Sequence, residues 1–440
     1  MEAPASHPPE CSDPHTQRTR LEASWDNGLH FDSADDRFHI HVGGNAQIDS
    51  TWLIAPQGAF AIPGGGMNGV DNSSATFIRR ARVRLEGDVY SQFDYVVEVD
   101  FANADNDNDG LQPPSFSNLN AAPALKNVWL QMREVPYVGN VRFGLQVVPL
   151  GMTNNTYQGF LPFMERADNM DAFYGAFSGG FALGLSAYNW TESERLTWHY
   201  GIYRPMTNVF GVALNKGVVG GRVTGLPLYE DEGERLIHVG LGTLGGELVQ
   251  DQLRVRARPL LRNGPGFAVP VLVDTGEIPG SRQYTIGPEF AMVWGPVTVQ
   301  AEWAGQFLTD AIANNQPQGT VFYHGGYVQA LYFLTGEHQE YVRREGVFGR
   351  VVPLNSYHLK KDDPSRGFGA WQIGARFSYL DLNDKAIQGG RLYDFTAGLN
   401  WFLNPNMKIQ FNYILERRDA PQDVVKSWIN GVGVRAAYDF

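Results

Sequence analysis

The sequence has little cysteine and no long run of apolar residues. Cys11 is the only cysteine among 440 residues, which excludes an intramolecular disulfide framework and any metal cluster held by several cysteines. No stretch approaches roughly 18 consecutive apolar residues, so membrane-spanning helices are excluded. Basic residues are also outnumbered, with 35 Lys and Arg against 47 Asp and Glu. The resulting net charge of −12 argues against a nucleic-acid partner and, taken alone, against an anionic ligand.

The chain instead contains 50 glycines, and aromatic side chains make up 12 % of its residues. From Arg37 onward, apolar residues recur with a period of two, most clearly in the last runs before the C-terminus. In the final run, Val432, Val434 and Ala436 alternate with Gly433 and Arg435. Successive side chains of a strand point to opposite faces, so each run has one apolar face and one polar or glycine-rich face. The pattern predicts an all-β protein.

Alternation also occurs in soluble β-proteins, which are the alternative here, and three further features favour a membrane barrel. The clearest runs last nine to thirteen residues, which is longer than the usual strand of about 5–6 and suits a tilted membrane strand. Aromatic residues gather near the ends of the runs, as in the interfacial girdles of membrane barrels. The chain also ends on a strand with Phe440 as its last residue. A terminal aromatic residue in that setting resembles the assembly signal of bacterial outer-membrane barrels.

Seventeen runs qualify as strands, but a barrel with both termini in the periplasm needs an even number. Short turns follow even-numbered runs near the N-terminus and odd-numbered runs near the C-terminus. One run between the ninth and the eleventh is therefore not a barrel strand. Removing the run at 250–262 leaves sixteen strands, makes 247–281 one long extracellular loop, and makes 337–368 an unusually long periplasmic connection. The prediction is a 16-stranded antiparallel transmembrane β-barrel over residues 37–440, preceded by a Pro-rich, polar and flexible segment, residues 1–36.

Three arginines share one face of the most basic strand, within the stretch FIRRARVRLEG. Arg80, Arg82 and Arg84 alternate with apolar residues. An arginine on the lipid face would cost about 2–4 kcal/mol at the bilayer midplane, so all three are expected to face the lumen. Neighbours on one face lie about 7 Å apart, which makes a ladder of guanidinium groups. Such a ladder offers fixed donors that can replace water around a passing anion.

A second basic pattern lies in the excluded segment DQLRVRARPLLR. Here Arg254, Arg256 and Arg258 alternate with apolar residues. If this segment folds into the pore, it brings a second ladder opposite the first. Arg142 and Arg376 are single candidates that are expected to face inward on other strands.

Acidic residues on the strand that follows the first ladder leave a second interpretation open. Asp94, Glu98 and Asp100 are also expected to face the lumen. The arginines would then form ion pairs with these carboxylates and make the wall polar without selecting anions. We predict anion conduction and keep ion pairing as the alternative.

A calcium site and an enzymatic function find little support. Asp105, Asp107 and Asp109 match the first half of a calcium-binding loop, but Phe116 stands where the loop needs its bidentate Glu. An acidic, solvated loop explains this segment better, and no other metal or cofactor is expected. The sequence contains neither HExxH nor G-x-S-x-G, so these common hydrolase signatures are missing. We therefore expect no catalytic residues.

Seven stretches and the pair GG at 389–390, in order along the chain, resemble the phosphate-selective porin O and P family. The resemblance spans nearly the whole chain after about residue 37. It implies a homotrimeric sixteen-stranded outer-membrane channel, in which arginines draw anions to a constriction built by inward-folded loops. The stretches are RRARVRLEG (79–87), FDYVVEVDFA (93–102), PFMERA (162–167), EFAMVWGPVTVQAEW (289–303), YVQALYFLTGE (327–337), GAWQIGARFSYLDLND (369–384) and GLNWFLNPNMKIQFNYI (398–414).

The resemblance also indicates which loops form the constriction. The third extracellular loop corresponds to 150–179 and the fifth to 247–281, the loop isolated above by strand parity. Glu165 and Arg166 of the third loop, together with Asp100, are the constriction candidates. A long inward turn in the family also makes the length of 337–368 less unusual.

The chain departs from the family pattern at two basic positions. Many relatives have a G-Q-F-K-E-P-F-G stretch, and Val147 stands at its lysine position. Phe181 stands where an arginine is common. These differences reduce the case for phosphate specificity more than the case for a general anion preference.

The combined prediction is a passive, anion-preferring porin of the bacterial outer membrane, and not an enzyme. Its expected partners are small anions such as phosphate or other oxyanions, outer-membrane lipid and two further copies of the chain, but no nucleic acid. The alternatives are a general or cation-preferring diffusion porin and a non-conducting structural barrel.

Overall fold

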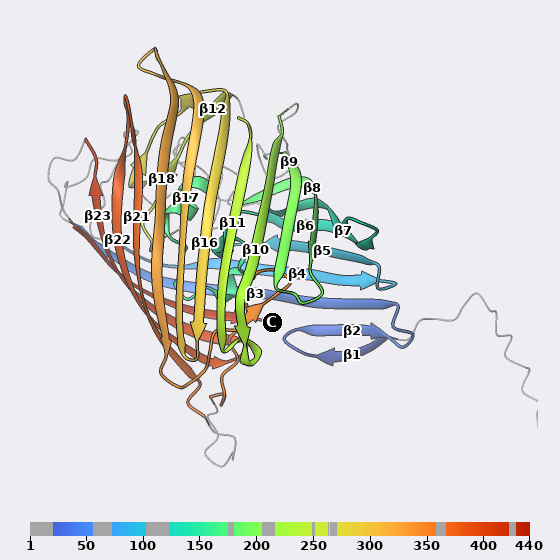
Figure 1. Ribbon diagram of the computed structural model, residues 1–440. Helices are drawn as coiled ribbons and strands as arrows, with labels where there is room; N and C mark the ends of the chain where they lie inside the picture. Colours follow the sequence, from blue (N-terminus) through green and yellow to red (C-terminus); the bar gives the residue numbers. More distant parts are fainter. Residues whose placement is uncertain are drawn as a thin grey trace, which may run out of the picture.

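Sixteen antiparallel strands form one closed barrel in the computed structural model (Figure 1). The structure describes residues 21–55, 73–102, 123–174, 180–204, 216–248, 251–262, 264, 271–357, 367–421 and 428–440. The last strand pairs with the first, which closes the barrel. In chain order the barrel strands are β3 (Phe38–Ile54), β4 (Ser73–Val89), β5 (Phe93–Asp100), β6 (Ala124–Val135), β7 (Gly139–Val147), β8 (Phe181–Trp190), β9 (Leu196–Arg204), β10 (Val218–Glu230), β11 (Arg235–Glu247), β16 (Arg282–Trp294), β17 (Val297–Ala313), β18 (Gln316–Phe333), β21 (Ala370–Asp384), β22 (Ile387–Asn404), β23 (Met407–Asp419) and β24 (Trp428–Asp439).

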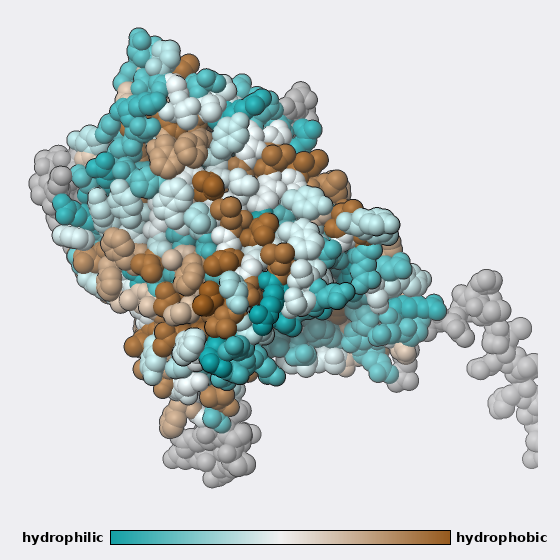
Figure 2. Space-filling model, viewed as in Figure 1, coloured by the Kyte–Doolittle hydropathy of each residue, from teal (hydrophilic) through white to brown (hydrophobic). Residues whose placement is uncertain are grey.

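The barrel is polar inside and apolar outside, which is the reverse of a soluble β-protein. In β3, Gln47 and Asp49 point inward and are buried, whereas Ile48 and Trp52 are exposed on the outer surface. Figure 2 shows apolar side chains gathered across the middle of the visible face, with hydrophilic side chains above them. Large apolar groups facing outward are stable only in lipid. The predicted transmembrane barrel is therefore confirmed, and the soluble alternative is wrong.

The exclusion of the run at 250–262 is also confirmed. Instead of a barrel strand, this segment contains the two-residue strands β12 (Gln252–Leu253) and β13 (Arg256–Ala257). They pair with β15 (Ile278–Pro279) and β14 (Val273–Asp274) of the same loop, outside the barrel sheet. Some strands are longer than predicted, because their polar ends continue the ladder beyond the apolar part. β18, for example, begins at Gln316 rather than at 326.

The N-terminal part of the chain differs from the predicted flexible segment. Residues 1–20 lie outside the described part of the chain. Within 21–36, however, β1 (Leu21–Trp25) and β2 (Leu29–Ser33) form a hairpin whose second strand pairs with the start of β3. The ring of Trp25 stacks on the C-terminal Phe440, with 6.5 Å between the ring centroids, and Figure 1 places the hairpin beside the C-terminus. Contacts with the barrel end thus order a segment whose composition alone predicts flexibility.

Three further connections carry short elements of their own. Between β7 and β8 lie α1 (Met152–Asn155), the 3₁₀ helix η2 (Gln158–Phe160) and α2 (Asp168–Tyr174). Between β18 and β21 lie β19 (Tyr341–Val342) and β20 (Val347–Phe348), and the turn from β10 to β11 contains η4 (Asp231–Gly233). Among the described residues, no helix is long and apolar enough to cross a membrane. We refer to residues 150–174 as the inner loop and to residues 337–357 as the long turn.

The polarity of the outer surface generates a stability prediction. Val328 of β18 is 49 % exposed on the outer face. We expect Val328→Arg to lower the free energy of unfolding in lipid vesicles by up to about 2–4 kcal/mol, because the charge then faces hydrocarbon. Urea titration of the refolded barrel measures this, and Val328→Leu is the matched control. An arginine variant as stable as the control would contradict the lipid-facing assignment.

Candidate functional site

The inner loop lies inside the barrel and is held there by a buried carboxylate. Arg79 of β4 donates to Glu165 through Nε and Nη2, at 2.8 and 3.0 Å. Arg435 of β24 donates to the same carboxylate at 3.2 Å, and its Nη1 donates to the carbonyl of Met164 at 2.5 Å. Burial alone would raise the pKa of Glu165, but Arg79, Arg80 and Arg435 bring it well below its usual value. Glu165 is therefore ionised and bound by two wall arginines, from β4 and β24, which lie on either side of β3.

Backbone carbonyls of the inner loop accept hydrogen bonds from other wall residues. Lys408 Nζ donates to Leu161 at 2.9 Å and Asn400 donates to Pro162 at 2.8 Å. Arg376 donates to the carbonyl of Glu165 at 3.0 Å. Buried carbonyls need such partners, since an unsatisfied one costs free energy. These donors fix the path of the loop against β21–β24.

The long turn also folds into the barrel. Arg222 of β10 donates to the carbonyls of Glu345 and Gly346, at 3.0 and 2.6 Å, and to Glu289 at 2.8 Å. On β11, His238 shares a 2.6 Å hydrogen bond with the hydroxyl of Tyr341. The unusual length predicted for this connection is thus accounted for, because it reaches inward and needs residues of its own.

Inward-folded segments fill one side of the barrel with apolar side chains. A continuous buried cluster joins Phe173 of the inner loop, Leu261 of the loop before β16, and wall residues such as Tyr323 and Leu380. A cavity of about 520 Å³ lies on the other side. Among the described residues, its lining includes none from β11, β16–β18 or β21–β24. The open space is therefore bounded by β4–β10, the inner loop, the long turn and residues 258 and 262.

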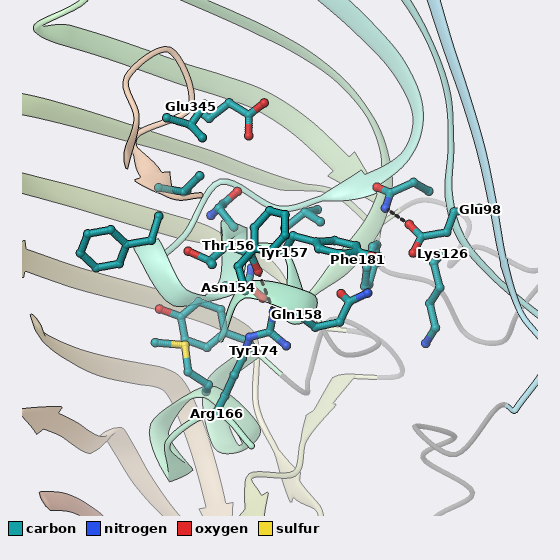
Figure 3. A pocket seen from close by; sticks show the side chains of 18 of the residues that line it. Glu98, Lys126, Asn154, Thr156, Tyr157, Gln158, Arg166, Tyr174, Phe181 and Glu345 are labelled. Carbon is teal, nitrogen blue, oxygen red and sulfur yellow. Dashed lines mark hydrogen bonds between the residues drawn. The ribbon is translucent and has the colours of Figure 1, made fainter. Parts of the chain in front are cut away.

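Basic groups outnumber acidic ones around this cavity. Among the residues that the structure describes, the lining holds eleven basic side chains and six carboxylates. Figure 3 shows Tyr157 and Gln158 of the inner loop near the middle of the view, Glu98 and Lys126 to one side of them, and Glu345 above. The basic residues are Arg79, Arg80, Arg82, Arg84, Lys126, Arg142, Arg166, Arg222, Arg258, Arg262 and Arg344.

A β-bulge in β4 adds an arginine that strand alternation assigns to the lipid face. Gln47 lies opposite Arg80, but Ile48 lies opposite Ile78, so Arg79 is an extra residue in the ladder. Arg79 and Arg80 are consequently both buried inside the barrel, while Ile78 is exposed outside. The prediction missed Arg79 because a bulge breaks the period of two on which it relied.

The predicted Arg80 ladder faces inward, and much of it is paired. Arg80 donates to Gln47 at 2.7 Å. Arg82 donates to Asp100 at 2.8 Å and to Glu98 at 3.3 Å. Arg84 lies 2.6 Å from a carboxylate oxygen of its own strand neighbour Glu86. The ion pairs that the sequence left as an alternative are therefore present at Arg82 and, with 3.9 Å to Glu98, at Arg84, whose shorter pair is with Glu86.

The other predicted arginines divide into two groups. Arg142 and Arg258 line the cavity together with the first ladder. Arg254, Arg256 and Arg376 are not among the described residues of this lining, and their place on an anion pathway stays a prediction. Arg254 forms an ion pair with Asp274 of its own loop at 2.6 Å, and Arg256 lies opposite Asp274 in the β13–β14 pair. Arg376 instead braces the inner loop.

Two of the three constriction candidates lie at the cavity. Glu165 and Arg166 line it from the inner loop. Arg166 donates to the carbonyls of Thr153 and Thr156, each at 3.0 Å, and so braces the loop's own first turn. Asp100 is buried in β5 opposite Arg82 and is not among the described lining residues, so its assignment to the constriction stays a prediction.

Several lining cations were not predicted. Arg262 pairs with Asp171 of α2 at 2.8 Å, and Arg258 donates to the same carboxylate from its backbone N–H at 2.9 Å. Burial opposes the charge on Asp171, but Arg262 and Arg258 lower its pKa. Arg344 pairs with Glu194 at 2.6 Å. Lys126 of β6 and Arg222 of β10, an inward position between Gly221 and Val223, lie on predicted strands and were overlooked, whereas Arg262 and Arg344 lie in loops without periodicity.

The metal hypothesis receives no structural support. Among the described residues, no group of three or more His, Cys, Asp or Glu side chains is placed to hold a metal ion. Asp105, Asp107 and Asp109 lie outside the described part of the chain.

A family model for the phosphate-selective porins O and P matches residues 57–440. The chain belongs to this family. The predicted family is therefore confirmed, and this porin is a channel-type protein of the bacterial outer membrane.

Curated relatives and solved structures agree with this assignment. The porin is 22 % identical over 437 residues to Porin O of Pseudomonas aeruginosa, covering 89 % of this chain and 86 % of that one. It is 28 % identical over 407 residues to an uncharacterized protein of Caulobacter vibrioides, covering 89 % and 71 %. The outer-membrane channel DcaP of Acinetobacter baumannii aligns with a TM-score of 0.51 at 11 % identity, covering 93 % and 99 %. OprB of Pseudomonas putida aligns with a TM-score of 0.51 at 10 % identity, covering 91 % and 94 %, and such likeness establishes the fold.

The buried anchor of the inner loop can be tested directly. We expect Glu165→Gln to lower the free energy of unfolding by about 3–5 kcal/mol, because it removes the buried negative charge that Arg79 and Arg435 share, although Arg435 keeps its second partner Asp49 at 2.7 Å. Glu230→Gln, which removes an exposed ion pair with Arg235, should change it by less than about 1 kcal/mol.

The same comparison has a pH dependence. A carboxylate with a lowered pKa contributes stability above the unfolded pKa of about 4.3 and loses it as the pH falls through the lower folded value. The stability difference between the native porin and Glu165→Gln should therefore be full at pH 7 and shrink below about pH 4. Urea unfolding over this range measures it, and a difference that grows in acid would contradict the anchor.

Proposed function

We propose that this porin conducts small anions in preference to cations, including phosphate or other oxyanions. The excess of basic groups around the cavity carries the proposal, since the described lining holds eleven Lys and Arg side chains and six carboxylates. Three further carboxylates, Asp100, Glu194 and Glu289, pair with lining arginines from outside the lining, and with them the count is eleven cations to nine carboxylates. Ions in a narrow, low-dielectric passage respond to nearby charge more than to the sum over the molecule. The net charge of −12 is therefore compatible with an anion pathway.

Arg142 is the lining cation that supports this proposal most clearly. It donates to the neutral Gln131 through Nε and Nη2, at 3.1 and 2.9 Å. No carboxylate of the described residues lies within ion-pairing distance of it, whereas Arg82 and Arg84 are paired. An unneutralised guanidinium attracts anions and offers them directional donors.

We expect Arg142→Gln to reduce the anion-to-cation permeability ratio about two- to threefold, the effect of one charge acting across about 7 Å of water. The reversal potential of single channels in asymmetric KCl measures this ratio. Arg235→Gln, outside the cavity lining, is the matched control and should leave the ratio unchanged.

The same recordings separate the alternatives. A cation-selective reversal potential for the native protein would sink the proposal and favour a general or cation-preferring porin. Zero conductance from folded protein would favour a non-conducting structural barrel, an alternative that the apolar filling of one side supports. We also expect a homotrimer by the family resemblance, which light scattering of the detergent-solubilised porin tests.

Phosphate recognition has its own test at Val147, which lines the cavity where many relatives have a lysine. Millimolar phosphate should reduce the chloride current of the native porin if phosphate binds in the cavity. Val147→Lys should strengthen this block, because it adds a cation to the lining. Val147→Met provides similar length without charge and should leave the block unchanged. Equal block in all three proteins would show that position 147 does not determine phosphate binding. If phosphate blocks none of them, the proposal that phosphate binds in the cavity is wrong.

A further inference from the structure

The surroundings of Arg142 are aromatic rather than acidic. Its guanidinium carbon lies 3.9 Å from the centroid of the Trp129 ring and 5.2 Å from that of Tyr188. Contacts of this kind stabilise a cation without neutralising its charge. Arg142 therefore presents a full positive charge between two aromatic faces, which distinguishes it from the ion-paired arginines of β4.

An unsatisfied nitrogen lies on the adjoining strand. His199 of β9 is opposite Tyr188 in the β8–β9 pair, and the two ring centroids are 5.9 Å apart. Its Nε2 is buried and has no hydrogen-bond partner among the described residues. A buried polar atom of this kind is normally satisfied by a ligand, an ion or water. Trp129, Arg142, Tyr188 and His199 thus occupy one stretch of the cavity lining, contributed by four consecutive strands.

A second aromatic–cation pair lines the same cavity. Lys126 Nζ lies 5.8 Å from the centroid of the Phe181 ring, and Figure 3 shows both side chains in the lining. Small inorganic anions gain nothing from aromatic side chains, since they are strongly hydrated and have no apolar surface. An anion with an attached ring gains both a charge-assisted hydrogen bond and a favourable aromatic contact.

We propose that Trp129, Arg142 and Tyr188 form a binding station for aromatic carboxylates. This inference rests on the proposed anion pathway and specifies one class of solute for it. The carboxylate accepts a hydrogen bond from the guanidinium, and the ring lies against the aromatic side chains. His199 offers an additional polar contact to the bound anion.

Two anions of equal charge test the station, benzoate and acetate, which differ by the ring. We expect benzoate to reduce the single-channel chloride current of the native porin at about a tenfold lower concentration than acetate, which corresponds to about 1.4 kcal/mol. Calorimetric titration of the folded porin in detergent should show the same order of affinities. Equal effects of the two anions in both measurements would overturn the proposal.

Substitutions locate the station. Trp129→Leu should bring the benzoate and acetate effects within about twofold of each other, because it removes an aromatic wall. The matched control is Trp294→Leu, since Trp294 also contacts an arginine, Arg235 at 5.6 Å, but lies on the outer surface. The control should keep the tenfold difference, and heat-modifiable mobility on gels verifies that each variant is folded. A tenfold difference that persists in Trp129→Leu would overturn the assignment.

Failure of this inference is distinguishable from failure of the proposed function. The reversal potential in a KCl gradient reports charge preference without any organic anion. An anion-selective reversal potential with equal benzoate and acetate effects removes only the aromatic station. A cation-selective reversal potential removes the anion pathway itself.

Discussion

The charge of Glu165 is buried inside the barrel, and the inner loop can occupy the lumen only because the wall supplies cations for it. A buried ion costs several kcal/mol unless it is paired and hydrogen-bonded. Arg79 and Arg435, from the first and last parts of the barrel, meet this requirement together. Neighbouring wall donors then satisfy the loop's carbonyls. The position of the loop, and with it one boundary of the cavity, follows from this interaction.

The interior is divided between packing and conduction. An apolar cluster joins the inner loop and the loop before β16 to the wall, mostly to the C-terminal strands but also to single residues of β3 and β8–β11. Strands β4–β10 face the remaining space and carry most of its basic groups. This division explains how a chain with a net charge of −12 can enclose a cavity whose described lining holds more basic than acidic side chains. The position of a residue along its strand decides whether its charged side chain faces the lumen, and the amino-acid composition carries no information on this.

The architecture could be predicted because it depends on a local sequence pattern and on the number of strands. A period of two shows which side chains face lipid, and the even number of strands identifies 250–262 as loop. The charged residues that face the lumen were harder to predict from the sequence. Arg79 was not predicted to face the lumen because a bulge breaks the alternation, and Arg344 was not predicted because its turn has no periodicity. Arg254 and Arg258 look equivalent in sequence, yet tertiary contacts direct one to Asp274 and place the other at the cavity.

The bulge at Arg79 bears on how such barrels can change their charge. In a regular strand, inserting one residue reverses the direction of all side chains on one side of the insertion. Here the extra residue is absorbed locally, since Ile78 still faces outward and Arg80 inward. Insertion of a single residue at a bulge can thus add one charged side chain to the lumen without replacing an existing residue. Insertions and deletions of single residues in barrel strands are therefore a route for tuning pores.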